Sequence, residues 1–290
     1  MEIGRFNQDS FLEISGKESG PTSVVLAGVH GNEPHGLRAF DLVIPKLEVQ
    51  RGVVWFGKGN PRAILKNTRD TEGDLNRKFK PFGELKPDER DDWEYHRAQV
   101  IQKYLKRADA LLDLHGTSND KTKPHVICEP PSFEVAVRMP VDIVLTGMDQ
   151  VMPGGTDYYM NQRGRIALCL EAGWNGDPDG AKIAEEGIYA FLKTIGHIEG
   201  EAVARRKRWF LAYGSYVNKT SEYSLIKPFK DFQKVKEGQV VATDGGQDVP
   251  VHEDSRIFFC SGVRIKEVGK EAFYLARDIP PPPEYSTKGT

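Results

Sequence analysis

The sequence has few cysteines, and those it has are far apart. Its 290 residues contain three, Cys128, Cys169 and Cys260. An odd number at wide spacing predicts neither a disulfide framework nor a CxxC metal site. We therefore expect reduced, buried thiols in a cytoplasmic protein.

Long apolar runs and a charge excess are also missing. No run reaches the roughly 20 residues of a membrane-spanning helix, and the polar stretch from Met1 to Gly16 has no apolar signal-peptide region. The formal net charge is −2, with acids and bases mixed along the chain. This balance favours neither nucleic acid nor a membrane surface as a partner and points to a small molecule instead. Oligomerisation stays open.

Two common catalytic signatures are absent as well. The sequence has no GxSxG elbow, which argues against a serine hydrolase. Gly57 and Gly59 are not followed by the remaining glycine of a dinucleotide-binding fingerprint. Hydrophobic residues make up 39% of the chain, enough to bury a sizeable core.

Apolar runs alternate with helical patterns over the first two thirds of the chain. This order predicts an α/β fold with a mixed sheet flanked by helices. In such a sheet, functional groups gather where strands end. The expected strands are 23–30, 53–56, 110–114 and 166–170, and the expected helices are 33–46, 93–107 and one that Asp177 and Pro178 open and that ends near Gly196.

The pattern of the sequence changes after about residue 204. Short apolar stretches alternate with Gly, Asp, Asn and Pro clusters, and no long helical pattern follows. We expect an α/β domain over residues 1–204 and a smaller β-rich domain over 205–290. Its predicted strands are 209–216, 240–243, 257–259 and 272–276.

Two histidines and a glutamate are candidate metal ligands. His30 and Glu33 stand three residues apart where a strand turns into a helix, and His115 follows the strand 110–114. Imidazole nitrogen and carboxylate oxygen are ligands that zinc accepts, and His₂Glu sets are typical of catalytic zinc. The alternatives are a helix start with a favourable acid and a polar residue that begins a loop. Asp113 is a candidate support for His115, whereas His35 is expected to point elsewhere.

Glu171 ends the apolar run 166–170. A carboxylate there is costly to bury without a purpose, although an exposed strand-end acid is the simpler reading. Beside a metal-activated water it would act as a general base.

Several arginines follow the second strand. They are Arg62, then Arg69, then Arg77 directly after Asn76. Surface arginines are common. A guanidinium can also pair with a substrate carboxylate or stabilise an oxyanion.

Taken in order, these segments resemble the succinylglutamate desuccinylase/aspartoacylase family, which is related to zinc carboxypeptidases. The matching segments are HGNE, NPRA, an isolated Arg, DLNR, DLHGT and LEAG, and they cover about residues 23–195. The resemblance implies a zinc-carboxypeptidase-like α/β domain with a β-rich C-terminal domain, and one Zn²⁺ per chain. It also implies hydrolysis of the amide bond of an N-acyl amino acid.

The resemblance also implies roles for individual residues. The matching residues are His30, Glu33 and His115 as zinc ligands, Glu171 as general acid and base, Arg69 at the scissile carbonyl, and Asn76 with Arg77 at the substrate carboxylate.

One family feature has no clean counterpart. The aspartoacylase branch places a further arginine before the catalytic glutamate, and here only Arg163 and Arg165 are candidates. The acyl group therefore stays open between acetyl, succinyl and others. Two alternative functions remain, a metallocarboxypeptidase acting on peptides and a non-catalytic protein that zinc holds together. The non-catalytic alternative gives Glu171 and Arg69 no function.

Overall fold

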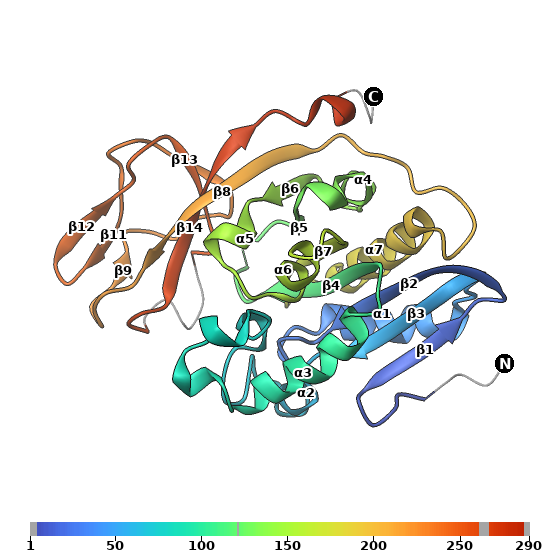
Figure 1. The fold of residues 1–290 in the computed structure, drawn as a ribbon. Helices are drawn as coiled ribbons and strands as arrows, with labels where there is room; N and C mark the ends of the chain where they lie inside the picture. Colours follow the sequence, from blue (N-terminus) through green and yellow to red (C-terminus); the bar gives the residue numbers. More distant parts are fainter. Residues whose placement is uncertain (1–4, 121, 261–266, 287–290) are drawn as a thin grey trace.

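The computed structural model describes residues 5–120, 122–260 and 267–286. Figure 1 shows how its strands and helices follow one another from the N-terminus to the C-terminus. The strands are β1 Phe11–Ser15, β2 Glu18–Ala27, β3 Arg51–Lys58, β4 Ala110–Thr117, β5 His125–Cys128, β6 Ile143–Thr146, β7 Ile166–Trp174, β8 Arg208–Val217, β9 Ser224–Leu225, β10 Gln233–Val235, β11 Val240–Asp244, β12 Gln247–Pro250, β13 Ser255–Phe258 and β14 Glu271–Ile279. The α-helices are α1 His35–Val43, α2 Pro61–Lys66, α3 Trp93–Leu105, α4 Phe133–Ala136, α5 Met148–Val151, α6 Thr156–Asn161 and α7 Gly180–Ile195.

Within these ranges, eleven strands form one mixed sheet in the order β1-β3-β2-β4-β7-β5-β6-β8-β14-β13-β10. Strands β3, β2, β4 and β7 run parallel to one another, whereas β5 pairs with β7 in the antiparallel direction. The strands β12, β11 and β9 form a second, three-stranded sheet. The predicted α/β class, with a mixed sheet flanked by helices and a β-rich C-terminal part, is confirmed.

The central strands are buried on both faces, as their continuous apolar sequences require. Leu26 of β2 lies opposite Asp113 of β4, which lies opposite Cys169 of β7. Side chains alternate between the two faces of a strand. His115 and Glu171, each two residues further along, are therefore on the same face as Asp113 and Cys169.

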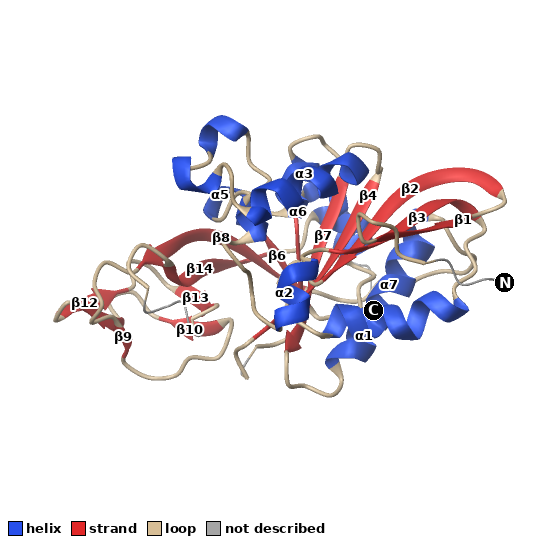
Figure 2. Cartoon of the chain, turned by 90° about the horizontal axis from the view of Figure 1, so that it is seen from below, coloured by secondary structure: helices blue, strands red, loops and turns tan. Residues whose placement is uncertain are grey.

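Helices cover both faces of this part of the sheet. Figure 2 shows α3 and α6 on one face and α1 and α7 on the other. Leu112, Leu114, Leu168 and Leu170 pack with residues of α1 and α7. The alternate positions, including Leu111, pack with residues of α3 and α6. The candidate site residues of β4 and β7 belong to the α3 and α6 face.

Several predicted boundaries need correction. Helix α7 begins at Gly180, so Asp177 and Pro178 lie in the turn before it. It ends at Ile195, next to the predicted Gly196, and this C-cap residue adopts φ +94°, which glycine accommodates most easily. His30 comes three residues after β2, whereas His115 and Glu171 lie inside β4 and β7.

The main sheet crosses the predicted domain boundary. Strand β8 follows residue 205 and pairs in parallel with β6, which precedes the boundary. Strand β14 then pairs with β8 in the antiparallel direction. The division into residues 1–204 and 205–290 stays a prediction.

Cys128, Cys169 and Cys260 are buried free thiols. Among the residues described, no helix has the length and apolar character needed to cross a membrane.

Candidate metal centre and active site

The parallel strands β2 and β4 bring the first three candidates together. Ala27, the last residue of β2, lies opposite Leu114, which directly precedes His115. The chain after β2 turns through His30 and Glu33 before α1 begins at His35. The turn approaches α2 so closely that a Cβ on Gly31 would meet the backbone carbon of Ala63 at 2.0 Å. Glycine at this position therefore allows His30 to reach the site.

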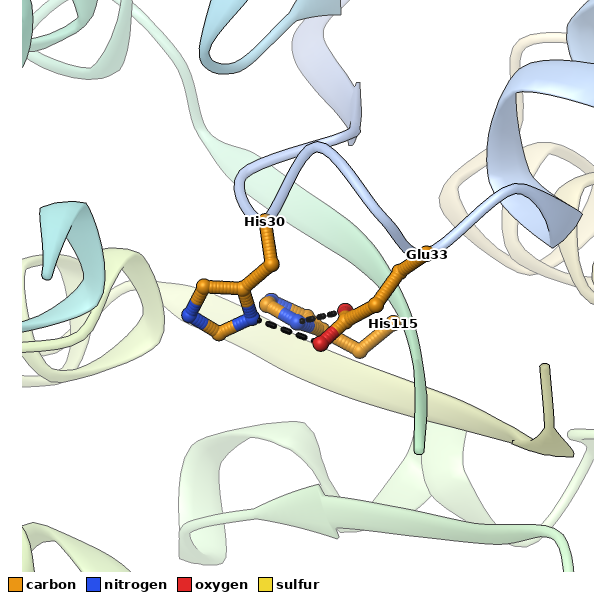
Figure 3. Close-up of side chains that lie close together, drawn as sticks. All are labelled: His30, Glu33 and His115. Atoms are coloured by element: carbon orange, nitrogen blue, oxygen red, sulfur yellow. Dashed lines mark hydrogen bonds and ion pairs between the residues drawn. The ribbon is translucent and has the colours of Figure 1, made fainter. Parts of the chain in front are cut away.

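Figure 3 shows both imidazole rings pointing at the carboxylate of Glu33. His30 Nδ1 lies 2.8 Å from Glu33 Oε1, and His115 Nδ1 lies 2.9 Å from Glu33 Oε2. The three residues are 3–5% exposed. Each offers one ligand atom, and these atoms lie within 4.8 Å of one another. The arrangement joins the three predicted ligands in one group that could hold a metal ion.

A second carboxylate stands behind each histidine. His30 Nε2 lies 3.1 Å from Asp74 Oδ1, and His115 Nε2 lies 3.2 Å from Asp113 Oδ2. Carboxylates in this position fix the orientation of a metal-bound imidazole and leave the other ring nitrogen for the metal. The donor set, with both Nδ1 atoms and Glu33 facing one point, fits zinc.

Glu171 lies beside this group on the next strand. It is opposite His115 in the register of β4 and β7 and only 8% exposed. Its Oε2 atom has no hydrogen-bond partner among the described residues. Burial raises the pKa of Glu171 to about 8, against the lowering influence of His115. A buried carboxylate is suited to proton transfer when one of its oxygens accepts no hydrogen bond from the described residues and candidate metal ligands lie next to it.

Arg69 reaches the same group from the loop after α2. Its Nη1 donates to Glu33 Oε1 at 3.4 Å, and its Nη2 donates to Asp74 Oδ2 at 3.2 Å. The side chain is 36% exposed. Arg69 therefore lies at the boundary between the buried ligand carboxylate and solvent.

Asn76 and Arg77 belong to a short 3₁₀ helix, Leu75–Arg77, which Asp74 caps through the backbone N–H of Asn76. Asn76 is buried, and its Oδ1 accepts a hydrogen bond of 3.3 Å from the backbone of Thr156. Arg77 Nη1 donates to the carbonyl of Asn76, and its Nη2 donates to Met152 Sδ at 2.8 Å. Because Asp74 also contacts His30, this pair is tied to the metal group through one residue.

The three remaining candidates lie elsewhere. Arg163 donates to the carbonyl of Tyr159, and Arg165 donates to the carbonyl of Ala108. Both precede β7, so about six strand residues, or roughly 20 Å, separate Arg165 from Glu171. These positions do not support a role for either residue as the acyl-side arginine. His35 Nε2 contacts the carbonyl of Trp174 at 2.8 Å and, as predicted, points away from the metal group.

One neighbour of Glu171 was not among the predicted residues. His125 of β5 lies opposite Glu171 on the side away from His115. It is fully buried, and burial lowers its pKa to about 4, so the ring is neutral near pH 7. Nothing near His125 in the sequence indicates this position, because it depends on the antiparallel pairing of β5 with β7.

Comparisons with known proteins bear on the family and on the fold. A family model described as the succinylglutamate desuccinylase/aspartoacylase catalytic domain matches residues 19–195. The succinylglutamate desuccinylase of Shewanella putrefaciens is 26% identical over 277 residues, which cover 84% of this chain and 79% of that protein.

Solved structures share the fold. A succinylglutamate desuccinylase/aspartoacylase from Rhodobacter sphaeroides has a TM-score of 0.71 at 21% identity, covering 96% of this chain and 94% of that one. A succinylglutamate desuccinylase from Vibrio cholerae has a TM-score of 0.75 at 18% identity, covering 93% and 85%.

Proposed function

Since the chain belongs to the succinylglutamate desuccinylase/aspartoacylase family, whose members are hydrolases that remove acyl groups, we propose that it is a zinc-dependent deacylase of N-acyl amino acids. The observation that carries the proposal is the convergence of His30, Glu33 and His115. On the adjacent strand, Glu171 has an oxygen to which no described residue hydrogen-bonds. We also propose a cytoplasmic location, which the buried free thiols support.

The metal's own contribution is limited to binding and polarisation. His30, Glu33 and His115 would hold the ion, with Asp74 and Asp113 fixing the two rings. When bound, zinc supplies a Lewis acid that lowers the pKa of a water molecule and polarises a carbonyl.

Glu171 is the proposed general acid and base. It takes a proton from the water whose oxygen forms a bond to the carbonyl carbon. It then delivers a proton to the nitrogen as the C–N bond breaks, which leaves an acid and a free amino acid. Burial raises the pKa of Glu171, and a divalent ion held by the three ligands would favour the ionised carboxylate.

Arg69 is the proposed partner of the scissile carbonyl. Its guanidinium is already directed at the ligand group by Glu33 and Asp74. A donor that is positioned before the reaction stabilises the oxyanion as it forms, without reorganisation at that moment.

Asn76 and Arg77 are the proposed site for the free α-carboxylate of the substrate. Arg77 hydrogen-bonds to uncharged groups, the Asn76 carbonyl and the Met152 sulfur. A carboxylate would give its planar fork two charge-assisted hydrogen bonds in their place. A substrate with a single amino acid on the amine side places this carboxylate close to the scissile bond.

A substrate panel tests the proposal. Purified, zinc-loaded protein is assayed by amine release with N-acetyl and N-succinyl amino acids, their α-carboxyl methyl esters, and peptides that end in the same residues. We expect hydrolysis of at least one N-acyl amino acid and near-complete loss with its ester. Efficient cleavage of the peptides with no use of any N-acyl amino acid would replace the deacylase by a carboxypeptidase. Retained metal with no hydrolysis in either set would leave only a structural role for the metal.

A further inference from the structure

A buried carboxylate outside the proposed site holds the loop between Arg69 and Asp74. Glu94 lies in the first turn of α3 and is fully buried. Its Oε1 accepts hydrogen bonds from Asn60 Nδ2 at 3.0 Å, from the Thr71 backbone N–H at 2.8 Å and from the Thr71 hydroxyl at 2.7 Å. These contacts leave little freedom for the start of the loop.

The second oxygen of Glu94 holds the rest of the loop. Its Oε2 accepts from the backbone N–H groups of Glu72 and Gly73, each at 3.1 Å. Burial favours the neutral acid, but the hydrogen bonds from Thr71 and Asn60 outweigh it and lower the pKa of Glu94. The ionised carboxylate therefore gathers the amides of three consecutive loop residues around one negative charge.

These three residues lie between two groups of the proposed site. Arg69 and Asp74 flank the segment 70–73, and both contact the ligand group, Arg69 at Glu33 and Asp74 at His30. The chain is also fixed on either side of this loop. Gly31 N–H donates to the Arg69 carbonyl at 3.2 Å, and beyond the loop the buried Lys78 Nζ lies 2.6 Å from Asp92, the N-cap of α3.

We propose that Glu94 is a positioning residue, which fixes the loop so that Arg69 faces the scissile carbonyl and Asp74 holds His30. The inference rests on the proposed function for the role of Arg69. Glu94 touches neither substrate nor reacting atoms and acts through the loop. A shift of about 1 Å in a catalytic group can lower turnover about 100-fold.

Asp244 of β11 provides a matched control, because it holds a loop in the same way in the C-terminal part. It accepts hydrogen bonds from the Lys219 backbone, the Thr220 hydroxyl and the Tyr216 hydroxyl, at 2.6–2.9 Å. It is 6% exposed. Its loop carries none of the proposed site residues, so Asp244→Asn measures what the loss of a buried loop anchor does to stability alone.

The experiment compares Glu94→Gln with Asp244→Asn in the zinc-loaded protein. The glutamine keeps the shape of Glu94 but places an NH₂ group against backbone N–H donors. We expect both variants to unfold at lower temperature. Only Glu94→Gln should lower kcat, by about 10- to 100-fold, with little change in KM. An unchanged kcat in Glu94→Gln, or an equal loss in Asp244→Asn, would overturn the proposal.

A double-mutant cycle separates this inference from the proposed function. If Glu94 acts through Arg69, Glu94→Gln should cost about twofold or less in kcat in an Arg69→Ala background. Fully additive losses would overturn the positioning role. An Arg69→Ala variant with normal turnover would instead overturn the proposed role of Arg69.

Hydrogen exchange in the metal-free protein gives a readout that does not depend on activity. The amides of Thr71, Glu72 and Gly73 should exchange at least tenfold faster in Glu94→Gln. Unchanged protection would mean that Glu94 does not hold the loop. If Glu94→Gln does not fold, Thr71→Val removes one of the five donors and should lower kcat several-fold. A normal kcat in that variant would then count against the proposal.

Discussion

The carboxylates behind the two histidines differ in one respect that can be measured. Asp113 contacts His115 and accepts a hydrogen bond from the Thr156 hydroxyl. Asp74 contacts His30 and, in addition, holds Arg69 at 3.2 Å. We therefore expect Asp113→Asn to impair metal binding alone, and Asp74→Asn to impair both metal binding and turnover.

The structure sets the size of each effect. Loss of a carboxylate behind a metal-bound histidine typically weakens metal affinity about 10- to 100-fold, and this applies to both variants. Loss of a hydrogen bond to a charged partner costs about 1.5–3 kcal/mol, which corresponds to about 10- to 150-fold. Because Arg69 keeps its 3.4 Å contact with Glu33, we expect the lower end. The kcat of Asp74→Asn should therefore be about tenfold below that of Asp113→Asn.

The assay must separate metal loading from turnover. Zinc affinity is measured by titration against a chromophoric chelator, and initial rates are then measured at saturating zinc. Asparagine retains one oxygen, so Asp74→Asn can still accept from the Asn76 backbone, and folding should be preserved. Equal kcat values for the two variants at saturating zinc would refute the idea that Asp74 couples the metal ligand to Arg69.

Four further variants test the proposed site. His115→Ala should lose most bound zinc by elemental analysis, and a full equivalent retained would remove it from the ligand set. Glu171→Gln should keep its metal while turnover falls by about 10²–10⁴, whereas near-normal rates would exclude it as the base. Arg77→Ala should lower kcat/KM by about 10- to 150-fold for substrates with a free α-carboxylate, and leave the low residual rate with their esters unchanged. Arg163→Ala should change neither kcat nor KM, because its guanidinium binds the Tyr159 carbonyl away from the site.

The parts of the fold that sequence reasoning predicted are those with long continuous signals. The apolar runs in β2, β4 and β7 are continuous, which is typical of strands buried on both faces of a sheet. Strands β5 and β6, of four residues each, were not predicted. A short apolar run does not distinguish a strand from a buried helix segment. The start of α7 was placed too early, because Asp177 and Pro178 are also common in turns.

The three candidate metal ligands could be predicted to lie together because of the topology of the sheet. Parallel neighbouring strands end at the same edge, so residues after β2 and near the end of β4 must approach one another. The resemblance to a family then supplied the roles. Arg163 and Arg165 precede β7, whereas Glu171 lies near its end. The backbone carbonyls that their guanidinium groups bind are visible only in the structure.

Among the residues that support the site, those close in sequence to their partners could be predicted, and those far from them could not. Asp113 is two positions from His115 on one strand, so the alternation of side chains suggests the contact. Asp74 stands 44 residues from His30, and Glu94 stands 21–23 residues from the amides that it binds. No local period links such pairs, since the loops between them can close in many ways. In the structure, Glu94 binds the backbone amides of the loop 70–73, and Asp74 stands at the end of this loop. The position of Arg69 thus depends on residues that the sequence around Arg69 does not indicate.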